Sequence, residues 1–153
     1  MIQRKQTIFL LLALVVVVVC LMQPVGLFIA EGMAPSRDMY NLYVASNEAA
    51  QGSTLMVFPL FILLLLSCPL MLWAIFAFKN RMRQALLCTG CSVLCMLWIV
   101  VYCVLGYAIG IDGYSFSMTW QACLPAVALV FLNLAHRAIM ADERLVRAAD
   151  RIR

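Results

Sequence analysis

The sequence contains very little charge for its size. Only 12% of its 153 residues are Asp, Glu, Lys or Arg, while 66% are hydrophobic. In soluble domains about a quarter of the residues are charged and about half are apolar. A soluble fold this small could not bury so much apolar surface, so the composition indicates a lipid environment. The length favours one domain, covering residues 1–153.

Charge is absent altogether from four long apolar stretches, at about 7–30, 55–78, 85–109 and 118–136. Each could form a helix that crosses a hydrocarbon core of about 30 Å. The sequence therefore predicts an all-α, polytopic membrane protein, a four-transmembrane-helix bundle. Outer loops would cover 31–54 and 110–117, a cytoplasmic loop 79–84 and a cytoplasmic tail 137–153. Without ionisable groups in its spans, the chain is a poor candidate for an ion carrier. Gln23, Gln121 and Asn133 are instead expected to form hydrogen bonds between helices.

Basic residues are distributed very unequally over this arrangement. Ten of the eleven Lys and Arg residues would lie on one side, together with three acidic residues. The other side would carry Arg37 and four acidic residues. The positive-inside rule makes the basic side cytoplasmic, with the N and C termini both inside. The net charge of +4 is thus interpreted as a topology signal and a lipid contact, and no nucleic-acid partner is expected.

The seven cysteines all fall within apolar stretches. Cys88, Cys91 and Cys95 form one helical stripe, which Ile99 and Gly106 extend. One interpretation is a membrane thiol-disulfide oxidoreductase that uses Cys88 and Cys91. The other is a helix-packing stripe, because cysteine is a small hydrophobe that lets helices approach closely. The second is favoured, since Cys88 and Cys91 would lie near the reducing cytoplasm and no neighbouring basic residue would activate them.

Known catalytic and cofactor motifs are missing. The chain has no G-x-S-x-G, P-loop, G-x-G-x-x-G or H-E-x-x-H sequence. Its single histidine, His136, cannot make a typical metal site and is expected in the cytoplasmic headgroup layer. Neither catalytic residues nor a cofactor or metal is therefore predicted.

The cytoplasmic segments carry the candidate contact residues. Residues 137–153 contain no helix breaker, and the sequence predicts a helix that continues or closely follows the fourth span. Its arginines could bind anionic lipid or acidic protein groups. The proposed partner or lipid contacts are Lys79, Arg81, Arg83, Arg137, Arg144, Leu145, Val146, Arg147 and Arg151. In the outer loop, Tyr40, Leu42, Tyr43 and Val44 should rest on the helix ends and cap the bundle.

Three segments carry a resemblance to a known family: MIQRKQTIFLLLA, IFAFKNRMRQ and LAHRAIMADERLVRAADRIR. The chain resembles a family of uncharacterised small four-helix inner-membrane proteins of the Bacteroidetes, described only as a domain of unknown function. That family typically has Asn where this chain has His136, which argues against a catalytic histidine. The resemblance implies the inner (cytoplasmic) membrane and supplies no activity.

Together these observations favour a non-enzymatic protein, an accessory or scaffolding subunit of a larger membrane assembly. Its expected partners are the lipid bilayer and either another membrane protein or further copies of itself. Two alternatives stay open. One is the thiol oxidoreductase, and the other is a carrier of a lipid or small hydrophobic molecule, which would need a cavity between helices.

Overall fold

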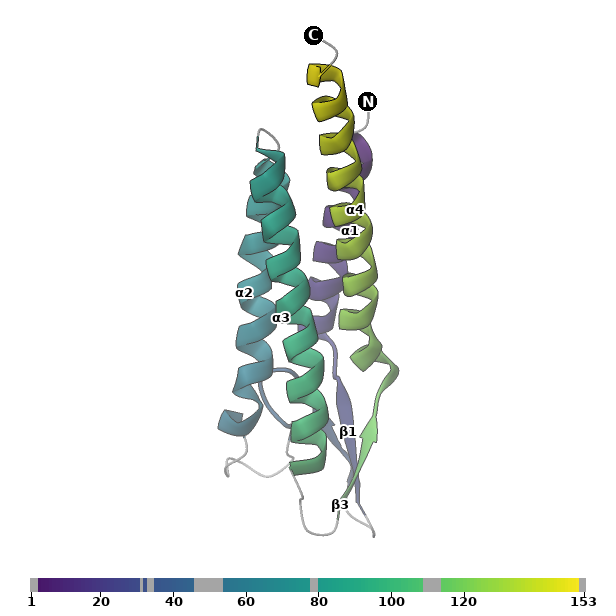
Figure 1. Ribbon diagram of the computed structural model, residues 1–153. Helices are drawn as coiled ribbons and strands as arrows, with labels where there is room; N and C mark the ends of the chain where they lie inside the picture. The colour runs from purple at the N-terminus through teal and green to yellow at the C-terminus, as the bar shows by residue number, and fades with distance from the viewer. Residues whose placement is uncertain are drawn as a thin grey trace.

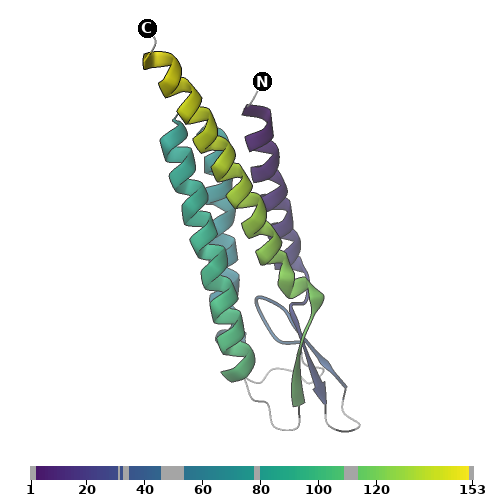
Figure 2. The ribbon, with the colours of Figure 1, turned by 45° about the vertical axis from the view of Figure 1, so that its right-hand side comes forward.

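The computed structural model describes residues 3–30, 32, 35–45, 54–77, 80–108 and 114–151. Within them, four long helices lie side by side and a small sheet sits at one end (Figure 1). The described residues nearest to both termini, and those on either side of 78–79, lie at the opposite end (Figure 2). We call these the sheet end and the terminal end. The helices are α1 (Gln3–Met22), α2 (Thr54–Phe76), α3 (Arg81–Ala108) and α4 (Leu124–Arg151).

The helices form a ring in which α1 contacts α2, α2 contacts α3, α3 contacts α4, and α4 returns to α1. Three described segments are long and apolar enough to cross a membrane, which indicates a membrane protein: Val57–Phe76, Arg81–Ala108 and Trp120–Ala148. The apolar part of α1, Gln6–Met22, is shorter. Large apolar side chains such as Leu11, Leu65 and Val104 are exposed on the outside of the bundle, as suits a surface in contact with lipid.

The core is a seam in which buried positions alternate steps of three and four residues along each helix. This spacing averages about 3.5 residues, the repeat of helices that pack knobs-into-holes and supercoil left-handedly. Small residues are frequent in the seam, which lets the backbones approach closely. Its members are Gln6, Leu10, Ala13, Val17 and Cys20 in α1; Val57, Leu60, Leu64, Ser67, Met71 and Ala74 in α2; Gln84, Cys88, Cys91, Cys95, Trp98 and Tyr102 in α3; and Pro125, Ala128, Leu132, Ala135, Ile139 and Asp142 in α4.

The apolar stretch 7–30 is not one helix. The prediction of an all-α fold is therefore wrong in part, because the structure also contains a small sheet. Helix α1 ends at Met22, and the chain continues as strand β1 (Gly26–Ala30). Pro24 explains the break, because it has no N–H for the helix and disfavours helical geometry at the preceding Gln23. The first helix is therefore shorter than expected, and the end of the stretch is used to build a sheet.

The sheet has three antiparallel strands in the order β2-β1-β3, where β2 is Arg37–Met39 and β3 is Tyr114–Met118. Gly26 pairs with Met39 on one side and with Met118 on the other. Strand β3 occupies the second half of the loop expected at 110–117. After it, a 3₁₀ turn, Trp120–Cys123, leads into α4. The fourth helix therefore starts at Leu124 rather than at residue 118.

Part of the loop expected at 31–54 caps the bundle. Asn41 is fully buried; its Nδ2 donates to the carbonyl of Cys20 at 2.7 Å, and its Oδ1 accepts from Trp98 Nε1 at 3.1 Å. Tyr102 stacks on Trp98 and donates to the carbonyl of Val25 at 2.6 Å. The predicted cap is thus present in residues 35–45. It depends on Asn41 more than on the expected residues, because Tyr43 and Leu42 are exposed. Residues 46–53 lie outside the described residues.

Phe116 joins the sheet to α3. Its ring lies 5.3 Å from that of Phe28 and 6.1 Å from that of Tyr102, centroid to centroid. A Cβ atom at Gly26 would come within 2.8 Å of this ring, and one at Gly106 within 2.7 Å. Gly106 is therefore a point of close approach between α3 and β3, rather than part of the cysteine face toward the other helices.

The polar residues expected to bridge helices do not do so in the described structure. Asn133 is exposed and donates to the carbonyl of Leu129 in its own helix at 2.9 Å. Gln23 is exposed beyond the end of α1. Gln121 lies in the 3₁₀ turn, and its Oε1 is buried without a hydrogen-bond partner among the described residues.

Asn41 and Asn133 provide a matched test of the cap. We expect Asn41→Ala to lower the free energy of unfolding by about 1–3 kcal/mol, because it leaves the Cys20 carbonyl and the Trp98 indole N–H unpaired. Asn133→Ala removes an exposed bond within one helix and should change it by less than about 0.5 kcal/mol. Unfolding of both variants in the same detergent measures the difference. Equal losses would show that Asn41 does not hold the cap.

Candidate interaction surface at the terminal end

A polar junction closes the seam at the terminal end. Gln6 of α1 and Asp142 of α4 are both nearly fully buried, and Gln6 Nε2 donates to Asp142 Oδ2 at 2.7 Å. The same Nε2 lies 3.2 Å from the carbonyl oxygen of Ala138. Arg81 of α3 donates from Nη1 to the backbone carbonyl of Asp142 at 3.1 Å. Three helices are therefore tied together at one point, at the last buried position described in α4.

Beyond Asp142, α4 projects past the ends of α2 and α3 (Figure 2). The helix is continuous to Arg151, which confirms the predicted helical tail. Leu145 is 61% exposed and Val146 42% exposed. Glu143 and Arg147 form an ion pair one turn apart, with Arg147 Nε 3.0 Å from Glu143 Oε1. The projecting turns thus offer an apolar patch beside basic side chains.

The other predicted contact residues are spread over this end. Arg137 and Arg144 are exposed on α4, and Arg83 is exposed on α3. Arg81 is half-buried in the polar junction and so contributes to packing within the bundle. Lys79 lies outside the described residues, as does the side chain of Arg151.

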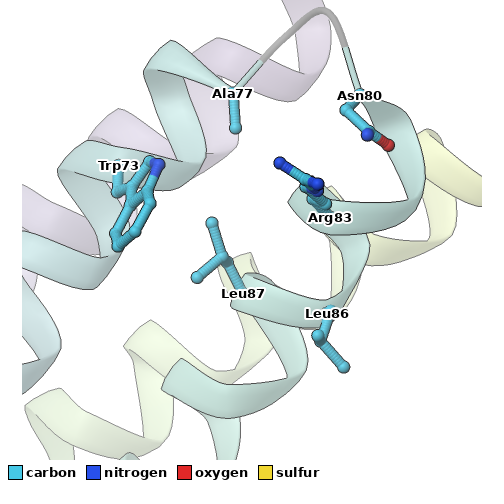
Figure 3. Close-up of a pocket in the computed structure, with 6 residues that line it drawn as sticks. All are labelled: Trp73, Ala77, Asn80, Arg83, Leu86 and Leu87. Atoms are coloured by element: carbon cyan, nitrogen blue, oxygen red, sulfur yellow. The ribbon is translucent and has the colours of Figure 1, made fainter.

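An open groove of about 480 Å³ lies between α2 and α3 close to their connection (Figure 3). Trp73 and Ala77 form one wall, Asn80 and Arg83 lie across from them, and Leu87 is between. Its lining residues are Trp73, Ala77, Asn80, Arg83, Leu86 and Leu87. The groove is mostly apolar, with its polar groups gathered near the helix connection.

Cys88, Cys91 and Cys95 are fully buried in the seam. The Cys91 thiol donates to the carbonyl of Ser67 in α2, with Sγ and O 3.9 Å apart. The stripe continues through Trp98 and Tyr102, while Ile99 is half-buried beside it. All seven cysteines are free thiols. Such burial suits packing, since a redox thiol must be reached by its partner in order to exchange.

His136 lies between α4 and α3. Its Nδ1 is 3.4 Å from the carbonyl oxygen of Ala85 and 3.5 Å from Thr89 Oγ1. Among the residues that the structure describes, no group of three or more His, Cys, Asp or Glu side chains could hold a metal ion. The ring therefore serves as a polar contact between two helices.

The comparison with protein families identifies the chain. Residues 2–152 match a family described as a domain of unknown function (DUF4293). The chain belongs to this family. Membership in DUF4293 thus covers nearly the whole sequence, including the junction, the groove and the projecting turns of α4. No curated protein matches the sequence.

Sequence reasoning missed the three polar residues that fasten the bundle: Gln6, Asn41 and Asp142. Gln6 and Asp142 had a signal, because each continues the three-and-four spacing of the buried positions in its helix. That spacing places a polar side chain in the seam, where it needs a partner. Asn41 lies in an irregular segment, so no periodicity marked it.

The cysteine stripe can be tested by size. We expect Cys88→Ala and Cys91→Ala to retain membrane insertion and to cost at most about 1–2 kcal/mol each, because alanine keeps the seam narrow. Cys91→Phe should instead disrupt assembly through overpacking. Thermal unfolding and size-exclusion chromatography in detergent measure both effects. A double alanine variant that folds normally but fails in the cell would favour the redox interpretation.

The polar junction makes a separate prediction. Asp142→Ala should lower the free energy of unfolding by about 1–3 kcal/mol, because the buried Gln6 amide loses its shorter hydrogen bond and keeps only the Ala138 carbonyl. Asp142→Asn keeps a carbonyl oxygen there and should recover part of the loss. Glu143→Gln, which affects only the exposed pair with Arg147, should change it by less than about 1 kcal/mol. If the variants at both positions had the same effect, the junction would not be fastening the helices.

Proposed function

We propose that this protein is a non-enzymatic, four-span protein of the bacterial inner membrane, an accessory or scaffolding subunit of a larger assembly. The observation that carries the proposal is the end of α4, where Leu145 and Val146 are exposed beyond the last buried seam residue. Apolar side chains grouped in this way are typical of contact surfaces. The arginines beside them suit acidic partner groups.

Helix α1 serves as the fourth span in this proposal. Its apolar part, Gln6–Met22, corresponds to about 26 Å of helix, at the lower end of the length that crosses a hydrocarbon core. It packs along α4 and α2 and exposes an apolar outer face that includes Ile8, Leu12 and Val15. A helix with that face needs lipid beside it as much as its neighbours do.

The charge distribution supports an orientation with both termini inside. Ten of the eleven basic residues belong to segments 1–6, 79–84 and 137–153, and the described ones among them lie at the terminal end. Arg37 and four acidic residues belong to segments 31–54 and 110–117. Of these, Arg37 and Asp38 lie in β2 of the sheet. Under the positive-inside rule, the terminal end faces the cytoplasm and the sheet lies outside.

The competing functions require features for which the structure gives less support. A thiol oxidoreductase would need Cys88 or Cys91 within reach of a substrate, and both are fully buried. A carrier would need a cavity inside the ring of helices, whereas the groove described above opens on the outside, between α2 and α3. Binding through the projecting end of α4 requires neither an accessible thiol nor an internal cavity.

The orientation predicts which sites an impermeant thiol reagent can reach in intact spheroplasts. With the exposed Cys123 replaced by serine, Asn47→Cys and Gly113→Cys should be labelled. Asn80→Cys should be labelled only after the membrane is opened, because it lies beside the basic residues that set the orientation. Labelling of Asn80→Cys in sealed spheroplasts would reverse the proposed topology.

The contact surface predicts separable losses in the tail. Deleting residues 144–153 keeps Asp142 and should leave a stably inserted protein that no longer retains its partner in mild detergent. Leu145→Asp combined with Val146→Asp should have the same effect. Binding would bury the two apolar side chains, and a carboxylate at each position opposes that burial. Asn133→Ala, an exposed change within the same helix, is the control. Full complementation of a deletion strain by the truncated protein would remove the tail from the proposed function.

A further inference from the structure

We propose that the groove between α2 and α3 binds an anionic phospholipid. Its phosphate would lie against the Arg83 guanidinium and the Asn80 amide, and an acyl chain would follow the apolar wall of Trp73, Leu86 and Leu87. The site is separate from the exposed patch of α4. It would retain its lipid whether or not the tail binds a protein.

The shape of the groove suits an amphiphile with one polar end. Figure 3 shows Arg83 and Asn80 together near the helix connection, with Trp73 and Leu87 farther along the hollow. The volume of about 480 Å³ lies in the range of small-molecule sites. Trp73 and Leu86 are 66% and 72% exposed, so a lipid could enter from the side of the bundle.

The state of Arg83 points to a phosphate. Arg81 donates a hydrogen bond to the Asp142 carbonyl, and Arg147 forms an ion pair with Glu143. For Arg83, the described part of the chain supplies neither an ion pair nor a side-chain hydrogen bond. A guanidinium group binds phosphate through two parallel hydrogen bonds. One unpaired cation above an apolar wall matches an anionic headgroup above an acyl chain.

The position of the groove favours lipid over an acidic protein segment. Its walls belong to α2 and α3, two of the helices that are long and apolar enough to cross a membrane. Tryptophan is enriched where such helices meet the headgroup layer. An acidic peptide could pair with Arg83, but it would leave Trp73 and Leu86 without an apolar partner.

The test compares retention of two lipids with identical acyl chains, phosphatidylglycerol and phosphatidylcholine. The purified protein is exchanged into detergent with an equal mixture, and bound lipid is measured by native mass spectrometry. Wild type should retain phosphatidylglycerol preferentially, and Arg83→Gln should weaken this roughly tenfold, as expected for loss of a charged hydrogen bond. The matched control, Arg37→Gln, removes an arginine of β2 in the sheet, outside the groove, and should retain the preference.

Two further measurements separate the outcomes. Leu86→Asn changes an exposed wall residue and should reduce retention of phosphatidylglycerol without unfolding the protein. Inorganic phosphate at millimolar concentration should not displace the lipid, because it cannot use the apolar wall. The proposal falls if Arg83→Gln retains the lipid as wild type does, if Arg37→Gln loses it equally, or if phosphate alone displaces it.

Discussion

Close packing along the seam is the constraint on which the rest of this structure depends. In lipid there is no hydrophobic driving force between helices, because the acyl chains are as apolar as the side chains. Helix association therefore relies on close packing, small residues and hydrogen bonds. The alternating three-and-four spacing brings residues such as Ala13, Cys91 and Ala135 to the contact faces. Four of the seven cysteines, Cys20, Cys88, Cys91 and Cys95, belong to this pattern.

Polar side chains fasten the two ends of the seam, where the apolar packing stops. At the sheet end, Asn41 joins the end of α1 to Trp98 of α3. At the terminal end, Gln6 joins α1 to Asp142 of α4. A buried amide without its partner would cost more than the bond contributes, so these residues also set the register of the helices. After Asp142, α4 leaves the bundle with its apolar side chains uncovered. The proposed contact surface is thus a direct consequence of where the seam ends.

The sequence predicts the long helices and the tail well, because their signals are local: apolar length, absence of charge, and absence of Gly or Pro after Arg137. The prediction fails at Gln23 and Pro24. The apolar stretch 7–30 is long enough for one span, so the helix break at Pro24 was given too little weight and β1 was not predicted. The sheet joins Gly26 to Met118, residues so far apart in the chain that no local pattern connects them. The groove was also invisible, since it depends on how Trp73 and Arg83 meet across two helices. The resemblance to a family described as a domain of unknown function came from three segments, and the match to residues 2–152 confirms that part of it.

The central claim is that the end of α4 holds a partner, and photo-cross-linking in living cells tests it most directly. A photoreactive amino acid at Leu145 is compared with one at Leu134, which is exposed on the same helix within the apolar stretch. The account predicts one dominant protein adduct from position 145, with another protein or a second copy of the chain. Position 134 should give lipid adducts alone. If position 145 gave no protein adduct, or the same adducts as position 134, the binding function proposed for the tail would be wrong.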